Sequence, residues 1–283
     1  MNIQWYPGHM TKAKRAIEAD IKLVDIIIEL VDARLPYSSR NPEIDRLGRH
    51  KARLILLNKA DLADEGVSHR WEEWFISQGH YVVKLNSRSG NGMKAVHAAI
   101  LEACRDKIER DRRKGILNRP VRAMVVGIPN VGKSTFINTF AKKAAAKTGN
   151  KPGVTKGNQW IRLNKSVELL DTPGILWPRF EDQQVGIRLA LAGSINDDIL
   201  NITELASEGI SALQCRYPGA IAGRYEIGEE GMPYEILAEI ARVRKCLAKG
   251  NEPDYDKAAR LFLDDLRSGR LGRISLELPQ EVK

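Results

Sequence analysis

Residues 127–134 have the sequence GIPNVGKS and constrain the fold more than any other stretch of this chain. The octapeptide fits the pattern G-x-x-x-x-G-K-[ST], in which glycines let the backbone curl so that successive N–H groups face a phosphate. An apolar run at 123–126 leads into it, and an amphipathic pattern at 133–143 follows. The stretch therefore predicts a P-loop between a buried strand and a helix of an α/β fold.

Two side chains of this loop have specific expected roles. Lys133 is expected to reach the β- and γ-phosphates of a nucleoside triphosphate, and the Ser134 hydroxyl to ligate Mg²⁺. Mg²⁺ is accordingly an expected cofactor. The residues expected to line the phosphate site are Asn130, Val131, Gly132, Lys133, Ser134 and Thr135.

Four further apolar runs alternate with helical patterns, and each run ends where a polar motif begins. The runs lie at 24–31, 54–57, 81–85 and 167–170, and the helical patterns at 67–78, 92–112 and 133–143. This alternation predicts a doubly wound parallel sheet whose ligand loops follow the carboxyl ends of the strands.

The tetrapeptide after the run at 54–57 matches the pattern N-K-x-D and consists of Asn58, Lys59, Ala60 and Asp61. The Asp61 carboxylate can accept hydrogen bonds from both the N1–H and the exocyclic amine of guanine. Adenine offers no such pair of donors, so its complex would leave those bonds unmade. The tetrapeptide therefore predicts that GTP and GDP are the ligands.

A polar turn follows the run at 81–85 and begins with Asn86 and Ser87. Its position at the end of a predicted strand beside the guanine motif suggests a role in base binding. We expect this turn to supply a backbone N–H to the O6 atom of guanine.

The run at 167–170 leads into the motif D-x-x-G, formed by Asp171 and Gly174. Asp171 is expected to hold Mg²⁺ through water, and the Gly174 N–H to sense the γ-phosphate. Between this motif and the P-loop lies a Gly- and Pro-containing segment with one well-placed hydroxyl, Thr155. Thr155 is the best candidate for the switch threonine that caps Mg²⁺ in the GTP state.

The motifs occur in a permuted order. A Ras-like GTPase has its P-loop first and its guanine motif late, whereas here the guanine motif precedes the P-loop and D-x-x-G comes last. Rejoining the pieces restores the usual strand succession with the break just after D-x-x-G, and the usual proximity of chain termini makes such a cut feasible. The segment most sensitive to the γ-phosphate then leads directly into the rest of the chain, and we expect hydrolysis to reposition that part.

A domain boundary is expected near residue 178, because the strand rhythm stops there and helical spacing takes over. Apolar residues recur at helical spacing over 236–247 and again over 255–266, the second time after a possible cap at Asp254. The prediction is a circularly permuted Ras-like P-loop domain at 1–178 and a C-terminal α-helical domain at 179–283.

Charge is unevenly distributed along the chain. The formal net charge is +9, and the whole basic excess lies before residue 175. A solvated surface explains such an excess, but on a domain that binds a polyanion it also makes nucleic acid a candidate partner. The three cysteines lack metal-ligand spacing, and neither a signal peptide nor a membrane span is recognisable, so a protein with reduced thiols in the cytoplasm is expected. A monomer without membrane contact is also expected.

The chain resembles the ribosome biogenesis GTPase A family of circularly permuted GTPases. The resemblance covers nearly the whole length and includes, besides the nucleotide motifs, WYPGHM at 5–10, DARLP at 32–36 and SRNP at 39–42. It implies a late step in assembly of the large (50S) ribosomal subunit, with GTP hydrolysis stimulated by that particle. It also implies a helical domain that contacts rRNA, for which Arg267, Arg270 and Arg273 are the local basic cluster.

Catalysis must differ from that of Ras, because Ile175 occupies the place of the glutamine that orients the attacking water. The resemblance implies that His9 is catalytic and either orients the water or acts as a base. Lys133 is expected to take part in catalysis through its contact with the phosphates. The resemblance further implies that Asn130 coordinates K⁺, a second expected cofactor, whose charge would act much as an arginine finger does.

Two other functions are compatible with the sequence. One is an RNA-binding assembly factor that uses GTP mainly as an occupancy switch. The other is a nucleotide-sensing GTPase unrelated to ribosomes.

Overall fold

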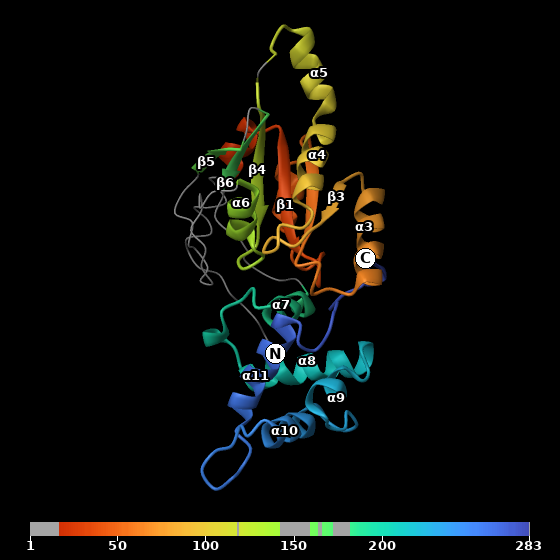
Figure 1. Cartoon of the computed structure of the whole chain (residues 1–283), viewed down its shortest axis with the longest axis vertical. Coiled ribbons are helices and arrows are strands. Elements are labelled where there is room, and N and C mark those ends of the chain that lie inside the picture. Colours follow the sequence, from red (N-terminus) through yellow and green to blue (C-terminus); the bar gives the residue numbers. More distant parts are fainter. Residues whose placement is uncertain (1–16, 118, 142–158, 164–165, 172–181, 283) are drawn as a thin grey trace. The chain divides into compact units, whose positions relative to one another are not determined.

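The computed structural model describes residues 17–117, 119–141, 159–163, 166–171 and 182–282. They form two compact units (Figure 1), a sheet unit up to residue 171 and a helical unit at 182–276. The described residues after 276, which include the short helix η3 (Pro279–Glu281), belong to the sheet unit. The boundaries predicted from the sequence placed these residues in the helical domain, because no pattern in so short a segment indicates where it packs.

The sheet unit is built on a six-stranded sheet of order β3-β2-β1-β4-β6-β5. Neighbouring strands are parallel except for β5, which runs antiparallel to β6. From β1 the chain moves outward to β2 and β3 and then returns to the other side of β1, so strand order reverses between β1 and β4, where open α/β sheets bind ligands. The strands are β1 Ile26–Asp32, β2 Ala52–Asn58, β3 Tyr81–Lys84, β4 Val121–Gly127, β5 Gln159–Arg162 and β6 Val167–Asp171.

All five predicted strands are present, and β5 is an additional strand that the sequence analysis did not predict. It lacks an apolar run, because Gln159 and Arg162 flank its two central residues. An antiparallel edge strand needs only one neighbour and can face water on one side, and Trp160 is exposed here.

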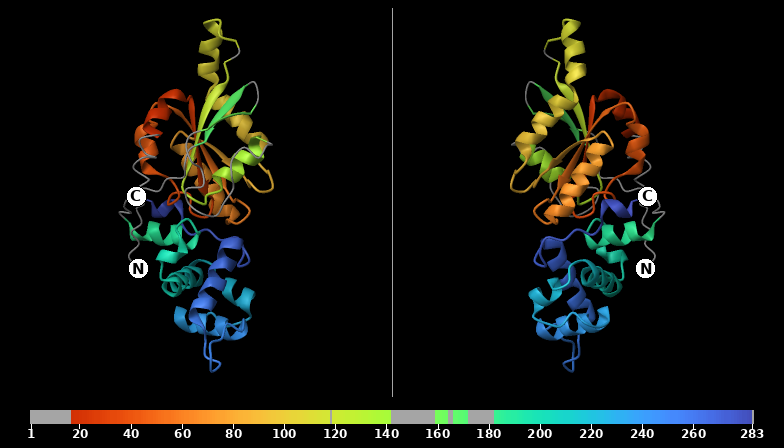
Figure 2. Two further views of the ribbon diagram at one scale, coloured as in Figure 1. Left: turned by 90° about the vertical axis from the view of Figure 1, so that its left-hand side faces the viewer. Right: turned by 90° about the vertical axis from the view of Figure 1, so that its right-hand side faces the viewer.

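Alternation along the strands gives the sheet two buried faces. On one face, Ile27 and Met124 meet residues from η1 (Ile21–Leu23) and α2 (Pro42–Leu47). Farther along the same face, Leu57 packs against Trp71 of α3 (Glu65–Ser77). Helix α4 (Met93–Ala103) packs on β2 and β3, and α6 (Lys133–Ala141) packs on β4. Figure 2 shows the helices on both sides of the sheet.

The single helix expected over 92–112 is wrong, since the structure has two helices there. Helix α4 ends at Ala103, Cys104 leaves helical geometry with φ −106° and ψ 11°, and α5 (Arg105–Arg113) follows. Helix α4 has an apolar face, whereas α5 buries no residue. The helical pattern at 92–112 therefore covers two helices, one that packs on the core and one that lies at the surface.

The helical unit contains α7–α11 and the short helix η2 (Asp197–Ile199). Helix α11 packs against α8 and α10, and at Gly209 of α8 a Cβ atom would lie 2.9 Å from a ring carbon of Phe262. Glycine thus lets the two helices approach closely. The predicted cap is confirmed, because the Asp254 side chain accepts a hydrogen bond of 3.0 Å from the Lys257 N–H. The helices are α7 Gln183–Leu191, α8 Ile202–Arg216, α9 Ala220–Tyr225, α10 Pro233–Val243 and α11 Tyr255–Ser268.

No helix in the described part of the chain is both long and apolar enough to cross a membrane.

A buried carboxylate organises the helical unit. Asp265 of α11 accepts hydrogen bonds from Arg224 Nε (2.8 Å) and the Tyr225 hydroxyl (2.9 Å), and another from Arg270. Burial alone would raise the pKa of Asp265, but these hydrogen bonds and the arginine charges outweigh it and hold the pKa below its ordinary value.

Replacing Asp265 with Asn is expected to destabilise the helical unit by about 2 kcal/mol, because two arginines lose their counter-charge. Since the folded-state pKa is depressed, this contribution is present above the unfolded-state pKa of about 4 and is lost as the pH falls below it. Thermal unfolding followed by circular dichroism at pH 7, 5 and 3 measures the difference.

Asp264→Asn is the matched control, because Asp264 is an exposed neighbour that pairs only at the surface with Arg270. Its expected cost is less than ~0.5 kcal/mol. An equal loss in the two variants, or a loss for Asp265→Asn that is undiminished at pH 3, would contradict the assigned role.

Candidate functional site

Three of the predicted motifs meet at one side chain, that of Asn58 at the end of β2. Its Nδ2 donates a hydrogen bond of 2.7 Å to the Val131 carbonyl in the P-loop. Its Oδ1 accepts hydrogen bonds from the Ser87 N–H (3.0 Å) and hydroxyl (2.8 Å). The side chain is only 2% exposed. Asn58 therefore ties the guanine motif, the P-loop and the turn after β3 together.

The P-loop has the expected place, between the end of β4 at Gly127 and the start of α6 at Lys133. Asn130 and Gly132 have positive φ values of 59° and 96°. At Gly132 a Cβ atom would lie 2.5 Å from Asn58 Nδ2, so only glycine permits this approach. Left-handed residues alternating with right-handed ones turn successive N–H groups toward one point, a geometry suited to anions.

The P-loop side chains differ in exposure. Lys133 is 7% exposed, whereas Ser134 and Thr135 are half-buried at the amino end of α6. The positive end of the helix dipole and the Lys133 charge both favour a phosphate at this position.

A buried ion-pair cluster adjoins the guanine motif and was not predicted as part of the site. Asp32, the last residue of β1, accepts hydrogen bonds from Lys59 Nζ (2.9 Å) and from Arg34 Nε (2.9 Å) and NH2 (2.8 Å). Burial alone would raise the pKa of Asp32, but the charges of Arg34 and Lys59 hold it well below its ordinary range. The same burial lowers the pKa of Lys59, and Asp32 partly offsets this effect. Asp32 thus fixes the Lys59 side chain.

The only sequence signal for Asp32 was its place in the DARLP motif directly after an apolar run. Such a position is shared by every other motif of the site, because all of them follow the carboxyl end of a strand.

The backbone around Lys59 directs Asp61 outward. Lys59 has φ 60°, the Ala60 N–H donates to the Leu85 carbonyl (3.1 Å), and the Leu62 N–H donates to the Lys59 carbonyl (2.9 Å). Asp61 is exposed on this turn. Its carboxylate is therefore accessible to the paired donors of a guanine ring.

The turn at Asn86 is more closed than expected. The Asn86 side chain accepts hydrogen bonds from the N–H groups of Arg88 (2.8 Å) and Ser89 (3.1 Å), and the Ser87 N–H is bound to Asn58. The N–H groups proposed for guanine O6 are thus engaged within the protein. Thr139 of α6 adds a hydrogen bond of 2.8 Å to the Ser87 carbonyl.

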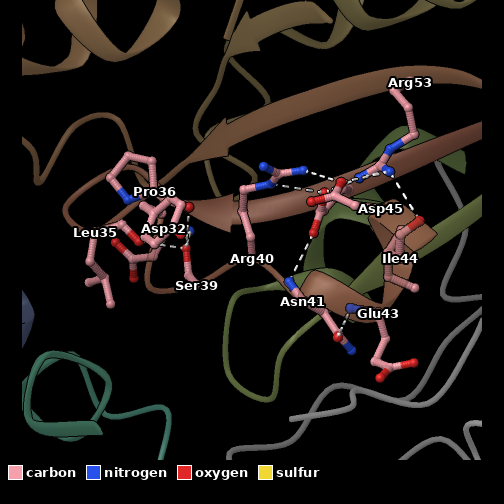
Figure 3. Close-up of polar contacts among 12 residues, drawn as sticks. Asp32, Leu35, Pro36, Ser39, Arg40, Asn41, Glu43, Ile44, Asp45 and Arg53 are labelled. Atoms are coloured by element: carbon pink, nitrogen blue, oxygen red, sulfur yellow. Dashed lines mark hydrogen bonds and ion pairs between the residues drawn. The ribbon is translucent and has the colours of Figure 1, made fainter. Parts of the chain in front are cut away.

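The loop between β1 and α2 is held by side chains that reach back to the sheet (Figure 3). The Ser39 hydroxyl accepts a hydrogen bond of 2.9 Å from the Asp32 N–H and donates one of 2.7 Å to the Leu35 carbonyl. Glu29, buried in the middle of β1, accepts from the Asn41 N–H (3.1 Å) and from Arg53 (2.5 Å). The loop that carries Asp32 and Arg34 is therefore rigidly attached to the sheet.

A second buried glutamate holds the same loop from the other end of the chain. The Glu277 carboxylate accepts hydrogen bonds from the N–H groups of Tyr37 and Ser38 (3.0 Å to Ser38) and from the Ser38 hydroxyl (2.5 Å). The Trp71 indole N–H donates to the Glu277 carbonyl at 3.2 Å. No pattern in the sequence indicated this contact.

Several predicted site residues lie outside the described part of the chain: His9, Thr155 and Gly174. Asp171 ends β6 beside β4, with Val125 as its neighbour in the register. Ser134 and Asp171 thus follow adjacent strands, and a hydroxyl with a carboxylate is an oxygen donor set suited to Mg²⁺. Their roles as Mg²⁺ ligands, like that of Thr155, stay predictions.

Comparison with known proteins identifies the family of the chain. Residues 122–219 match a family model described as "50S ribosome-binding GTPase". The chain is 49% identical over 284 residues to ribosome biogenesis GTPase A of Bacillus cereus, covering 99% of this chain and 95% of the relative. It is 34% identical over 280 residues to ribosome biogenesis GTPase A of Thermotoga maritima, covering 99% and 96%.

Two solved structures are similar along nearly the whole chain. GDP-bound YlqF has a TM-score of 0.67 and 30% identity, with 93% of this chain and 99% of that chain covered. GNP-bound YlqF from T. maritima has a TM-score of 0.66 and 31% identity, with 95% and 99% covered. The chain therefore belongs to the ribosome biogenesis GTPase A family and is a circularly permuted P-loop GTPase that hydrolyses GTP.

Proposed function

We propose that this GTPase acts in late assembly of the large (50S) ribosomal subunit and that the subunit particle stimulates its GTP hydrolysis. The observation that carries the proposal is the guanine and phosphate site organised by Asn58, in a chain with full-length similarity to ribosome biogenesis GTPases. The description of the matching family model, a 50S ribosome-binding GTPase, supports the large subunit as partner.

Nucleotide recognition is assigned to the loops that Asn58 joins. Asp61 accepts the two guanine donors, and Lys59, held by Asp32, lays its aliphatic stem across the base. The P-loop from Asn130 to Thr135 encloses the phosphates, with Lys133 nearest the β- and γ-phosphates. Ser134, Thr155 and Asp171 would hold Mg²⁺, whose charge would offset the negative charge that develops during phosphoryl transfer.

Hydrolysis breaks the bond between the β–γ bridging oxygen and the γ-phosphorus as water attacks, and yields GDP and phosphate. With isoleucine at position 175, water positioning is assigned to His9. Asn130 would hold a K⁺, whose charge would offset negative charge on the phosphates. Its left-handed backbone, with φ 59°, turns the P-loop sharply beside the phosphate site.

The segment after β6 is assigned the role of detecting γ-phosphate release, through the N–H of Gly174. The chain continues from this segment into the helical unit, so the loss of one contact acts on the connection between the two parts. The protein is further proposed to act in the cytoplasm, a location that fits a function on ribosomal particles, and to be a monomer.

The particle-binding assignment is tested by co-sedimentation of the protein with large-subunit precursors in a GTP analogue, GDP and no nucleotide. Co-sedimentation is expected mainly with the analogue, and addition of particles is expected to raise the GTPase rate at least ~100-fold. Equal absence in all three states would overturn the ribosomal assignment and favour a nucleotide sensor.

In the same assay, His9→Ala is expected to bind particles with the analogue but to lose most of the stimulated hydrolysis. If this variant still leaves the particle at the wild-type rate in GTP, hydrolysis is dispensable for release and the protein uses GTP as an occupancy switch.

Asp61→Asn is expected to lower GDP affinity at least ~100-fold and to favour xanthosine diphosphate, because the amide matches the exchanged donor and acceptor of that base. Fluorescence titration with both nucleotides measures the switch. Glu65→Gln, a nearby charge removal on α3, is the control. Unchanged GDP affinity in Asp61→Asn would contradict the assignment.

Replacing Na⁺ by K⁺ is expected to accelerate hydrolysis about tenfold or more if a cation offsets charge on the phosphates. Asn130→Gly preserves the left-handed backbone and removes only the amide, so it should abolish this response while GDP affinity persists. A response to K⁺ of equal size in wild type and variant would exclude Asn130 as the ligand.

A further inference from the structure

Helix α5 contributes nothing to the core of the sheet unit. None of its nine residues is buried, and Ile108 is its only aliphatic residue. A polar helix this short is marginal in water unless ion pairs support it. Core packing therefore does not explain why α5 is present, which favours a role at the surface.

One face of α5 is anchored to the sheet unit by an ion pair, and a second ion pair on this face lies within the helix. Lys107 Nζ lies 3.2 Å from an Asp25 carboxylate oxygen and 3.0 Å from an Asp111 carboxylate oxygen. Asp25 directly precedes β1. The helix is thus attached at the amino ends of the strands, opposite the loops that carry the nucleotide motifs.

The end of α5 is sharply defined. The Gly115 N–H donates to the Arg112 carbonyl and the Ile116 N–H to the Asp111 carbonyl, both at 2.9 Å, and Gly115 has φ 78°. These two hydrogen bonds to the last turn form a Schellman motif, in which the residue at the position of Gly115 adopts a left-handed conformation. The structure therefore gives α5 a defined carboxyl end.

The face of α5 opposite its anchor is rich in arginine. At 100° per residue, Arg105, Arg112 and Arg113 point away from Lys107 and Asp111. The side chains of Arg105 and Arg113 are 63% and 80% exposed and form surface ion pairs with Glu102 (3.0 Å) and Glu109 (3.8 Å). Figures 1 and 2 show α5 extending from the sheet unit beyond the strands.

Much of this positive charge is not neutralised. Residues 105–117, which we call the basic arm, contain six basic and three acidic residues. Within the described part of the chain, the side chains of Arg110, Arg112 and Lys114 form no ion pair. The arm therefore presents a field that attracts a polyanion.

Two of the three arginines expected to contact RNA in the helical unit, Arg267 and Arg270, form hydrogen bonds within that unit. Arg267 forms two hydrogen bonds with Asp197, of 2.7 and 2.8 Å, and one with the Ala190 carbonyl of 2.8 Å. Arg270 is bound to Asp264 and Asp265. Arg267 and Arg270 therefore stabilise the helical unit, and the basic arm is the better candidate for RNA contact.

We propose that the basic arm binds the phosphate backbone of structured RNA. Arginine forks match phosphate oxygens, and each contact gains from the release of bound counterions. A membrane surface would need an apolar helix face, which α5 lacks. The exposed aliphatic side chains of the arm are those of Ile116 and Leu117, just after the helix, and two such side chains do not form the apolar core of a protein interface. The exposure and charge of α5 support RNA binding by themselves, whereas the identity of that RNA as large-subunit rRNA rests on the proposed function.

The test compares a triple variant, Arg110→Gln, Arg112→Gln and Arg113→Gln, with a matched control. Glutamine keeps the helix propensity high, so α5 itself should persist. The control, Lys22→Gln, Arg49→Gln and Arg70→Gln, removes the same charge from exposed positions of the sheet unit outside the arm. The probes are purified large-subunit precursors and a 20-base-pair RNA hairpin, each titrated between 50 and 200 mM salt.

The arm variant is expected to lose at least ~10-fold in affinity for both probes at 0.1 M salt. Its plot of log affinity against log salt is expected to be shallower by about two to three units, because about three phosphate contacts are lost. The control should keep the wild-type affinity and slope. Both variants should keep the wild-type melting temperature, GDP affinity and particle-free hydrolysis rate, since the arm lies opposite the nucleotide loops.

Wild-type hairpin affinity and salt slope in the arm variant would overturn the proposal. Loss of particle binding with unchanged hairpin binding would instead assign the arm to a ribosomal protein and would also overturn it. If the wild-type protein binds no particle in any nucleotide state, the function proposed above fails, and the hairpin titration still decides whether the arm binds RNA.

Discussion

The nucleotide site depends on the side-chain amide of Asn58. A P-loop, a guanine motif and a polar turn are each flexible alone, and they come from three different strands of the sheet. Asn58 donates to the first at Val131 and accepts twice from the turn at Ser87, so the amide oxygen uses both of its acceptor positions. Gly132 completes the arrangement, because any side chain there would collide with the amide. The distance between base and phosphate subsites is thereby set before nucleotide binds.

A second layer of buried charge holds the guanine motif itself. Asp32 is buried, and a carboxylate in such a place is tolerated only because Arg34 and Lys59 both bind it. The loop that carries this cluster is in turn fastened by Glu29 and by Glu277, which approach it from the sheet and from the end of the chain. Replacing these ion pairs with apolar side chains could preserve stability, but it would release Lys59. The main effect of these ion pairs is therefore to hold the Lys59 side chain in place.

The sequence allowed the parallel strands and the order of the motifs to be predicted, because each apolar run ends at a polar motif. It did not allow β5 to be predicted, since an edge strand needs no apolar run, nor the break at Cys104, since Ile108 continues the helical spacing. The contacts that build the site join residues far apart in the chain. Asp32 and Lys59 are separated by 27 positions, Asn58 and Val131 by 73, and Ser38 and Glu277 by 239. Only the fold brings such pairs together, so local patterns predict roles for Asp61 and Lys133 but not the residues that hold them in place.

The separation of the basic arm from the nucleotide loops restricts what each can do. The arm is anchored at Asp25, before β1, whereas guanine and phosphate motifs follow the opposite ends of the strands. A contact that is equally strong in the GTP and GDP states adds affinity to both and shifts neither. Because the arm lies away from the nucleotide loops, we expect it to supply affinity for RNA that is independent of nucleotide. Any difference between the two states must come from elements that the γ-phosphate reaches, and the permuted order places the D-x-x-G segment, which continues into the helical unit, in that position.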